Sequence, residues 1–269
     1  KKWLPLAIDS TKHLKPVEKL RVVEKLKELK DRASVKSGRP YDNELGSWLQ
    51  NALTQHRINP FHAIIGTDNP GGDDVVLRAD DVDEHHALMT VPHECAVPRN
   101  VESLSAALSE LLRLGSRIVF VEPFFDPYNR RHKQIFFRLL SIVQDLNPNT
   151  VCEIHYRYHE NKPANADLER QARALFEHII PQGMTLDVFC WREKDGGEDF
   201  HARYLLTDKG GIRIDAGFDP VGEHQKTDMS LMDFGLSQMR LTCISRNATT
   251  YELVEPVLRI DSNGTVQHL

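Results

Sequence analysis

Residues 201–219 read HARYLLTDKGGIRIDAGFD. The apolar run after Arg203, the turn sequence Asp208-Lys209-Gly-Gly and the apolar residues 212–214 predict a β-hairpin. On an extended first strand, His201 and Arg203 point to the same face because side chains alternate with a period of two. We expect Asp208 to join them near the end of this hairpin. A base, a permanent cation and a carboxylate form a set suited to a phosphate group.

The sequence on the amino side of this hairpin alternates between strand and helix patterns. The expected strands are 116–127, 150–160 and 184–191, and the expected helices between and before them are 101–115, 131–146 and 166–180. Such alternation is typical of βαβ units. The sequence therefore predicts an α/β fold with a mixed, mostly parallel sheet flanked by helices. After the hairpin, residues 239–246 suggest one more strand and residues 249–258 a short helix.

One face of the expected strand at 150–160 is unusually polar. Glu153, His155, Arg157 and His159 alternate with apolar or aromatic residues. A strand covered on both faces is normally apolar throughout. We interpret this segment as an exposed edge strand, with the alternative that His155 and Arg157 line a phosphate site beside His201.

The first hundred residues have a different character. Residues 14–32 repeat apolar side chains at helical spacing, with Glu–Lys pairs between them, and a shorter helix is expected near 43–56. We expect a basic helical extension over residues 1–57 and the α/β domain over residues 58–269. The apolar stripe of the helix at 14–32 must dock on the body, a second subunit or a partner protein.

The charge distribution is uneven. Residues 1–40 contain 12 Lys or Arg against 5 Asp or Glu, whereas the whole chain has a net charge of −5. A basic arm can contact nucleic acid, an anionic lipid surface or an acidic partner, and it can also be a solvated helix face.

Composition is otherwise that of an ordinary globular protein, with 40% hydrophobic and 27% charged residues. The sequence has no apolar run long enough for a membrane span and no signal-peptide pattern at its first residues, which suggests a cytoplasmic protein. Its four cysteines show no CxxC spacing and are expected to be mostly buried free thiols. The cluster His85, His86, His93, Glu94 and Cys95 matches no zinc-ligand spacing, so we expect a polar loop there and no metal or other cofactor.

His201-x-Arg203-x4-Asp208 resembles the HxK-x4-D signature of the phospholipase D superfamily, with Arg in place of Lys. In that family Gly-Ser-x-Asn follows, whereas this sequence has Gly217-Phe218-Asp219. Glu122-Pro123-Phe124-Phe125 is similar to the acidic-Pro-aromatic turn that precedes the hairpin in the family. The likeness covers roughly residues 100–260 and is greatest to the single-motif, phospholipase D-like C-terminal domain of MIT-domain proteins and its bacterial relatives.

The resemblance implies a metal-independent phosphodiesterase. His201 would form a phosphohistidine, Arg203 would stabilise the phosphoryl oxygens, and Asp208 or Glu122 would orient the imidazole. His155, Arg157, Gly217 and Asp219 would bind phosphate or support the site.

The family uses two histidines, one from each of two motif copies. The segment His155-Tyr156-Arg157-Tyr158 has Lys162 where Asp is needed. A homodimer is therefore expected, with a phosphodiester substrate that is nucleic acid rather than lipid. The resemblance to bacterial relatives also implies a role in bacterial defence.

Two other functions are compatible with the sequence. One is a catalytically inert module that binds phosphoinositide, nucleic acid or a partner protein. The presence of Arg203 where the family has Lys favours this alternative. The other is a metal-dependent nuclease using Asp126, Glu153 and a nearby Lys, although the acidic-x-Lys strand that it needs is missing because Glu153-x is followed by His155.

Overall fold

The computed structural model describes residues 3–32, 38–83, 85–148, 150–160 and 165–269. The chain divides into two compact units, residues 36–93 and a larger unit formed by residues 1–35 and 94–269. The expected boundary between residues 57 and 58 is therefore in the wrong place, because it falls inside the smaller unit. The reason is that the helix ending there packs on the strands that follow it.

The smaller unit is a helix packed on two short parallel strands. Its elements are η2 (Asn43–Leu45), α3 (Trp48–Ile58), β1 (Ile64–Gly66), β2 (Val76–Arg78), η3 (Ala79–Asp81) and η4 (Ala87–Met89). Its buried cluster consists of Ala52, Ile64 and Val76. The Arg39 guanidinium donates to the Asn59 carbonyl at the end of α3 and lies 3.8 Å from the centre of the Phe61 ring. Arg39, near the start of this unit, therefore packs against the residues that follow α3.

The larger unit is organised around a nine-stranded mixed sheet with the order β11-β10-β6-β5-β4-β7-β8-β9-β3. The strands are β3 (Glu94–Arg99), β4 (Arg117–Val121), β5 (Val151–Arg157), β6 (Thr185–Arg192), β7 (Tyr204–Thr207), β8 (Gly210–Ile214), β9 (Gly222–Leu231), β10 (Glu252–Asp261) and β11 (Val266–His268). Only the neighbours β4–β5 and β5–β6 pair in parallel in the described sheet. The mixed sheet is confirmed, but the expectation that it is mostly parallel is wrong, because hairpins and long returning strands extend it on both sides.

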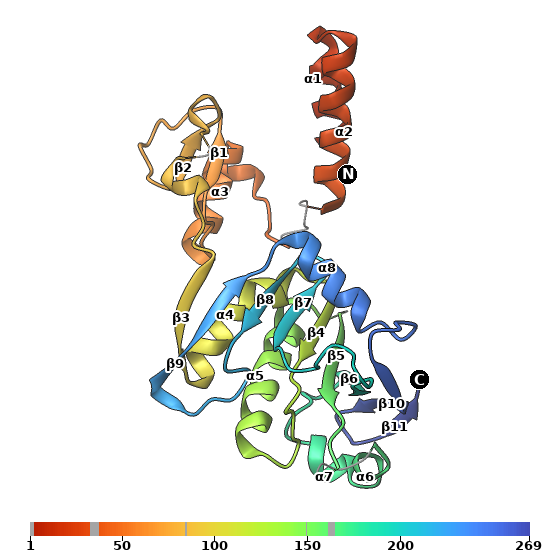
Figure 1. Ribbon diagram of the computed structural model, residues 1–269. Helices are drawn as coiled ribbons and strands as arrows, with labels where there is room; N and C mark the ends of the chain where they lie inside the picture. The colour runs from red at the N-terminus through yellow and green to blue at the C-terminus, as the bar shows by residue number, and fades with distance from the viewer. Residues whose placement is uncertain (1–2, 33–37, 84, 149, 161–164) are drawn as a thin grey trace. The chain divides into compact units, whose positions relative to one another are not determined.

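One face of the sheet carries the main core and is covered by helices (Figure 1). These are α4 (Val101–Leu114), α5 (Arg130–Leu146), α6 (Asn165–Arg170) and α7 (Ala172–Phe176). Leu104, Leu108 and Leu112 of α4 recur at helical spacing and are buried. Since burying a leucine stabilises by roughly 2 kcal/mol, this apolar stripe determines which face of α4 meets the sheet.

The opposite face is covered by α8 (Phe234–Cys243) over a second cluster that includes Val119, Trp191 and Leu206. The strand expected at 239–246 is wrong, because Ser237 and Leu241, four residues apart, are buried together on one side of a helix. The helix expected at 249–258 is also wrong. That segment belongs to β10, which pairs with β6 across the sheet.

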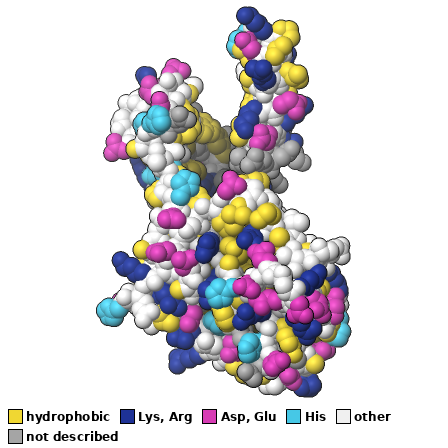
Figure 2. All heavy atoms as spheres, in the orientation of Figure 1, with side chains coloured by type: hydrophobic (Ala, Val, Ile, Leu, Met, Phe, Trp, Pro, Cys, Tyr) yellow, Lys and Arg dark blue, Asp and Glu magenta, His cyan; other side chains and the backbone are white. Residues whose placement is uncertain are grey.

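The helix expected at 14–32 is confirmed as α2 (Pro16–Arg32), which packs against α1 (Trp3–Ser10) and the short η1 (Thr11–His13). Val23 and Leu26 are half-buried, whereas Val17 and Leu20 remain exposed. Apolar side chains are visible along this helix pair in Figure 2. Because Val17 and Leu20 of α2 are exposed, we still propose that a partner protein docks on this segment.

None of the helices within the described ranges is long and apolar enough to cross a bilayer. The four cysteines are free thiols; Cys152 and Cys190 are buried as expected, whereas Cys95 is exposed. Within those ranges no three His, Cys, Asp or Glu side chains are grouped as a metal site needs.

Candidate functional site

The predicted hairpin at 201–219 forms as β7 and β8, joined by a turn at Asp208 and Lys209. His201 and Arg203, however, precede β7 and lie in the segment that leads into it. The expectation that both lie within the first strand of the hairpin is therefore wrong, although the two side chains do face the same ring, that of Phe124. Tyr204 pairs with Val121, so this segment lies at the carboxyl end of β4.

Asp208 lies at the opposite end of β7 from Arg203. The four residues of β7 separate them, which at about 3.3 Å per residue is more than 10 Å. Asp208 Oδ1 instead accepts a hydrogen bond of 2.7 Å from the Ser116 N–H. Although burial opposes ionisation, hydrogen bonds from Ser116 lower the pKa of Asp208. The expected grouping of His201, Arg203 and Asp208 does not form, and Asp208 supports the turn before β4.

Glu122 is the carboxylate that accompanies Arg203. It follows β4 directly, is buried, and accepts hydrogen bonds from the N–H groups of Phe124 at 3.1 Å and Phe218 at 3.0 Å. Its Oε1 lies 3.9 Å from Nε of Arg203. The Arg203 guanidinium also donates to the carbonyl of Asp215 at 3.0 Å. Glu122 thus holds the loops after β4 and β8 in place and lies behind the cation.

Gly217 makes this close approach possible. Its φ is +72°, and a Cβ built there would lie 2.3 Å from Oε2 of Glu122 and 3.3 Å from Nε of Arg203. Both the positive φ and the lack of space require glycine.

Phe124 is the centre of the cluster. The guanidinium carbons of Arg203 and Arg157 lie 5.0 Å and 5.3 Å from the centre of its ring, and the His201 ring meets it edge-on at 5.7 Å. The Phe124 side chain is 36% exposed. Phe124 follows β4, Arg157 ends β5, and His201 and Arg203 precede β7, so the four residues meet at the carboxyl end of the parallel strands. We call Glu122, Phe124, Arg157, His201 and Arg203 the carboxyl-end cluster.

Arg157 is oriented by Glu193, which follows β6. Its Nη1 lies 3.2 Å from Oε1 of Glu193, and the same oxygen accepts the N–H of Phe200 at 2.7 Å. Sequence reasoning missed Glu193. Its position immediately after a buried strand, like that of Glu122 after β4, is the signal that could have found it.

His201 differs from the other members because its ring is exposed. Within the described part of the chain it forms no hydrogen bond or ion pair; its ring contact is with Phe124. Arg203 contacts the same Phe124 ring, and among the described residues no carboxylate is hydrogen-bonded to the His201 imidazole.

His155 does not reach this cluster. It is fully buried on the central strand β5, so the interpretation of this segment as an exposed edge strand is wrong. Its Nδ1 accepts from the Trp191 indole N–H at 2.9 Å, and its Nε2–H donates to Glu153 at 3.0 Å. Burial lowers the pKa of His155. The polar face of β5 is therefore an internal network.

Glu153 is the centre of that network. Arg117 binds it through two hydrogen bonds of 2.6 Å and 2.7 Å. Burial opposes ionisation, but the hydrogen bonds from His155 and Arg117 outweigh it and lower the pKa of Glu153 to about 2. On β6, Asp187 is held in the same way by Arg259, through two hydrogen bonds of 2.7 Å. The carboxylate of Glu153 is thus fully paired, and among the described residues it is not grouped with Asp126 as a metal site would require.

Asp219 joins the loop after β8 to helix α5. Its carboxylate forms an ion pair of 2.9 Å with Arg131, and its carbonyl accepts from Arg99 at 3.1 Å. Its role in the structure is to hold the start of α5 against this loop, next to Gly217.

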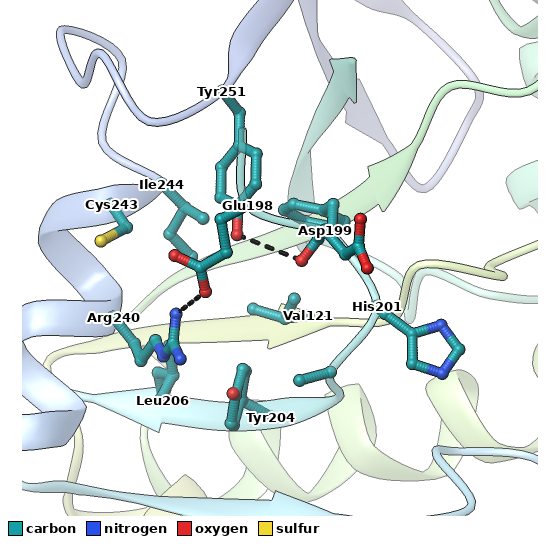
Figure 3. A pocket seen from close by; sticks show the side chains of 12 residues that line it. Val121, Glu198, Asp199, His201, Tyr204, Leu206, Arg240, Cys243, Ile244 and Tyr251 are labelled. Atoms are coloured by element: carbon teal, nitrogen blue, oxygen red, sulfur yellow. Dashed lines mark hydrogen bonds and ion pairs between the residues drawn. The ribbon is translucent and has the colours of Figure 1, made fainter. Parts of the chain in front are cut away.

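A small pocket lies behind the segment that carries His201 (Figure 3). It lies under α8, and its volume of about 30 Å³ is room for roughly two water molecules. Arg240 and Glu198 pair across its mouth, while the His201 ring points away from it. The exposed side of His201 therefore belongs to the carboxyl-end cluster.

Comparison with known proteins assigns this chain to no family. No protein-family model matches it, and no curated protein matches it. Among solved structures, TrmBL2, an archaeal chromatin protein described as showing a novel mode of DNA binding, aligns with 56% of this chain and with half of its own length. The identity is 11% and the TM-score 0.31.

Proposed function

We propose that the protein binds a phosphate-bearing ligand, nucleic acid in preference to lipid, at the carboxyl-end cluster. The observation that carries this proposal is the convergence of Arg157, Arg203 and His201 on the exposed ring of Phe124. A planar guanidinium group can donate two parallel hydrogen bonds to two oxygens of one phosphate. An exposed aromatic ring can stack on a base. The ends of parallel strands are also where sheets of this kind commonly bind ligands.

Each arginine of the cluster has one carboxylate partner, Glu122 for Arg203 and Glu193 for Arg157, and an anionic ligand would use the donors that remain. Both oxygens of Glu122 accept backbone N–H groups, and the carboxylate lies 3.9 Å from Arg203. Glu122 therefore offsets the positive charge of Arg203 without closing off its guanidinium. An anion placed over Phe124 would meet both Arg203 and Arg157.

Titration calorimetry with thymidine monophosphate and with inorganic phosphate tests this proposal. Arg203→Gln and Arg157→Gln are each expected to weaken binding about tenfold, because each removes a charge-assisted contact worth roughly 1.5 kcal/mol. Arg78→Gln, which removes an exposed guanidinium from the smaller unit, should leave binding unchanged. Equal affinity in the wild type, Arg203→Gln and Arg157→Gln would refute the site.

The second candidate function is a metal-independent phosphodiesterase in which His201 is the nucleophile. Its support is the exposed imidazole, which lies beside Arg203 and has no hydrogen-bond partner in the described residues. A ring nitrogen would attack phosphorus and displace an alkoxide, and water would then hydrolyse the phosphohistidine. A second imidazole must protonate the alkoxide, so the proposal requires a homodimer that pairs two His201 side chains.

Hydrolysis of bis-p-nitrophenyl phosphate in EDTA separates the two functions. Activity that persists in the chelator and disappears in His201→Ala supports the enzyme. Phosphate binding that survives in His201→Ala, with no turnover by the wild type, supports the inert module. Sedimentation of the active species as a monomer would contradict the paired-histidine mechanism.

A further inference from the structure

Helix α5 begins with charges opposite to those that its dipole favours. Residues 127–144 contain no Asp or Glu, while the first four residues of α5 include Arg130, Arg131 and Lys133. The amino end of a helix is itself positive, so cations there are unfavourable by a few tenths of a kcal/mol each. Helix α4 has the usual order, with Glu102 in its first turn and Arg113 in its last. Proteins place locally unfavourable residues mainly at functional sites, so this charge pattern at the start of α5 suggests a binding site.

The internal acids of the chain neutralise only part of this charge. Arg131 pairs with Asp219. Lys133 donates to the carbonyl of Ala174 at 3.3 Å, which leaves its charge unpaired in the described structure. Neither Arg130 nor His178 forms an ion pair or hydrogen bond within the described residues.

These unpaired groups line one groove. It has a volume of about 330 Å³ and is formed by Arg130, Lys133, Gln134, Phe137 and His178. The four residues from α5 follow the i, i+3, i+4, i+7 spacing, so they lie on one face of the helix. Phe137 is 45% exposed and is the last of these four residues along the helix. No carboxylate is among the residues that line the groove.

We infer that this groove binds single-stranded nucleic acid, with phosphates against Arg130 and Lys133 and an unpaired base stacked on Phe137. The inference rests on the proposed function, because it makes the groove a second contact for the strand held at the carboxyl-end cluster. Arg130 and Phe137 are separated by seven residues, or about 10 Å along the helix, enough for a short stretch of strand. An exposed aromatic ring in a basic groove selects a single strand, because in a duplex the base faces are stacked on each other.

The linkage between the groove and the carboxyl-end cluster runs through the start of α5. Arg131, next to Arg130, pairs with Asp219, and Asp219 is two residues from Gly217, where a Cβ would lie 3.3 Å from Nε of Arg203. The start of α5 is thus joined through one loop to the segment beside Arg203.

Fluorescence anisotropy with a labelled oligothymidine of about 12 nucleotides tests the inference. Phe137→Ala and the double variant Arg130→Gln/Lys133→Gln are each expected to weaken binding about tenfold or more, since stacking on one base alone has that effect. Phe137→Tyr, which keeps the ring, should stay within about twofold of the wild type. Arg138→Gln is the matched charge control, because it lies on the same helix outside the groove lining.

Thymidine monophosphate distinguishes the groove from the carboxyl-end cluster. Its binding should be weakened by Arg203→Gln and unaffected by the substitutions in the groove. If these groove variants bind oligothymidine as the wild type does, or if the wild type binds a duplex equally well, the inference is wrong. If the wild type binds the mononucleotide but not oligothymidine, the inference also fails while the proposed function stands.

Discussion

Two segments of the sheet share the pattern His-x-Arg-Tyr and use it in opposite ways. In 155–158 the histidine is fully buried and both ring nitrogens are hydrogen-bonded, to Trp191 and Glu153. In 201–204 the histidine is exposed, makes no hydrogen bond within the described residues and forms a T-shaped ring pair with Phe124. The two arginines nevertheless meet at the same phenylalanine ring. The difference teaches that accessibility, rather than the residue pattern, separates a structural histidine from one that can meet a ligand.

The largest effect that would sharpen this comparison is expected on the buried side. Glu153→Ala removes the acceptor of both Arg117 and His155, so we expect a loss of about 4 kcal/mol in the free energy of unfolding. Glu193→Ala, at the half-exposed partner of Arg157, should cost less than about 1 kcal/mol. Urea unfolding measures both. If Glu193→Ala lowered the free energy of unfolding more than Glu153→Ala, Glu153 would not be the structural carboxylate and Glu193 the peripheral one.

The next effect concerns the backbone of the carboxyl-end cluster. Gly217→Ala adds a Cβ that would lie 2.3 Å from Oε2 of Glu122, at a φ of +72°. We expect a loss of about 3 kcal/mol, of which the positive φ contributes roughly 1 kcal/mol. Gly183→Ala has a similar φ of +84° but no neighbour within 4 Å, and it isolates the effect of φ. Equal losses in the two variants would show that Glu122 and Arg203 do not require the close approach.

The smallest effect is a pH dependence that belongs to the buried histidine. Burial lowers the pKa of His155, so the unfolded chain takes up its proton first, and stability should fall as pH decreases below about 6.5. A further fall is expected below about 4.5, towards the pKa of about 2 of Glu153.

His155→Gln should flatten the first part of this profile. The slope that remains would include His132, whose pKa is also lowered by burial. Urea midpoints measured between pH 5 and 8 check this prediction. An unchanged profile in His155→Gln would mean that His155 is not buried in its neutral form.

The sequence predicted the elements whose apolar spacing is regular. The α2, α4 and α5 helices and the β4 to β6 strands lie where expected, because their buried residues repeat with a clear period. The errors occur where short apolar runs fit either period. The segment MRLTCISR has the composition of a strand, yet Leu241 packs as part of a helix that begins at Phe234, before the run.

The site was predictable in its residues but less so in its geometry. Glu122, Arg157, Arg203 and Gly217 meet at the carboxyl ends of the strands, as proposed from the chain order. Asp208 and His155 do not, because β7 starts only at Tyr204 and because β5 is central rather than at an edge. Strand boundaries and strand order depend on long-range pairing, which local sequence spacing does not encode.

The two outermost strands of the sheet bear on how copies of the chain can associate. β11 has three residues, and β3 carries Pro98, which has no N–H to offer a further strand. Neither border is a good template for sheet extension, so the fold is protected against aggregation by strand addition. Self-association that pairs two His201 side chains would therefore have to use loops and side chains at the strand ends. The sheets of the two copies would not join edge to edge.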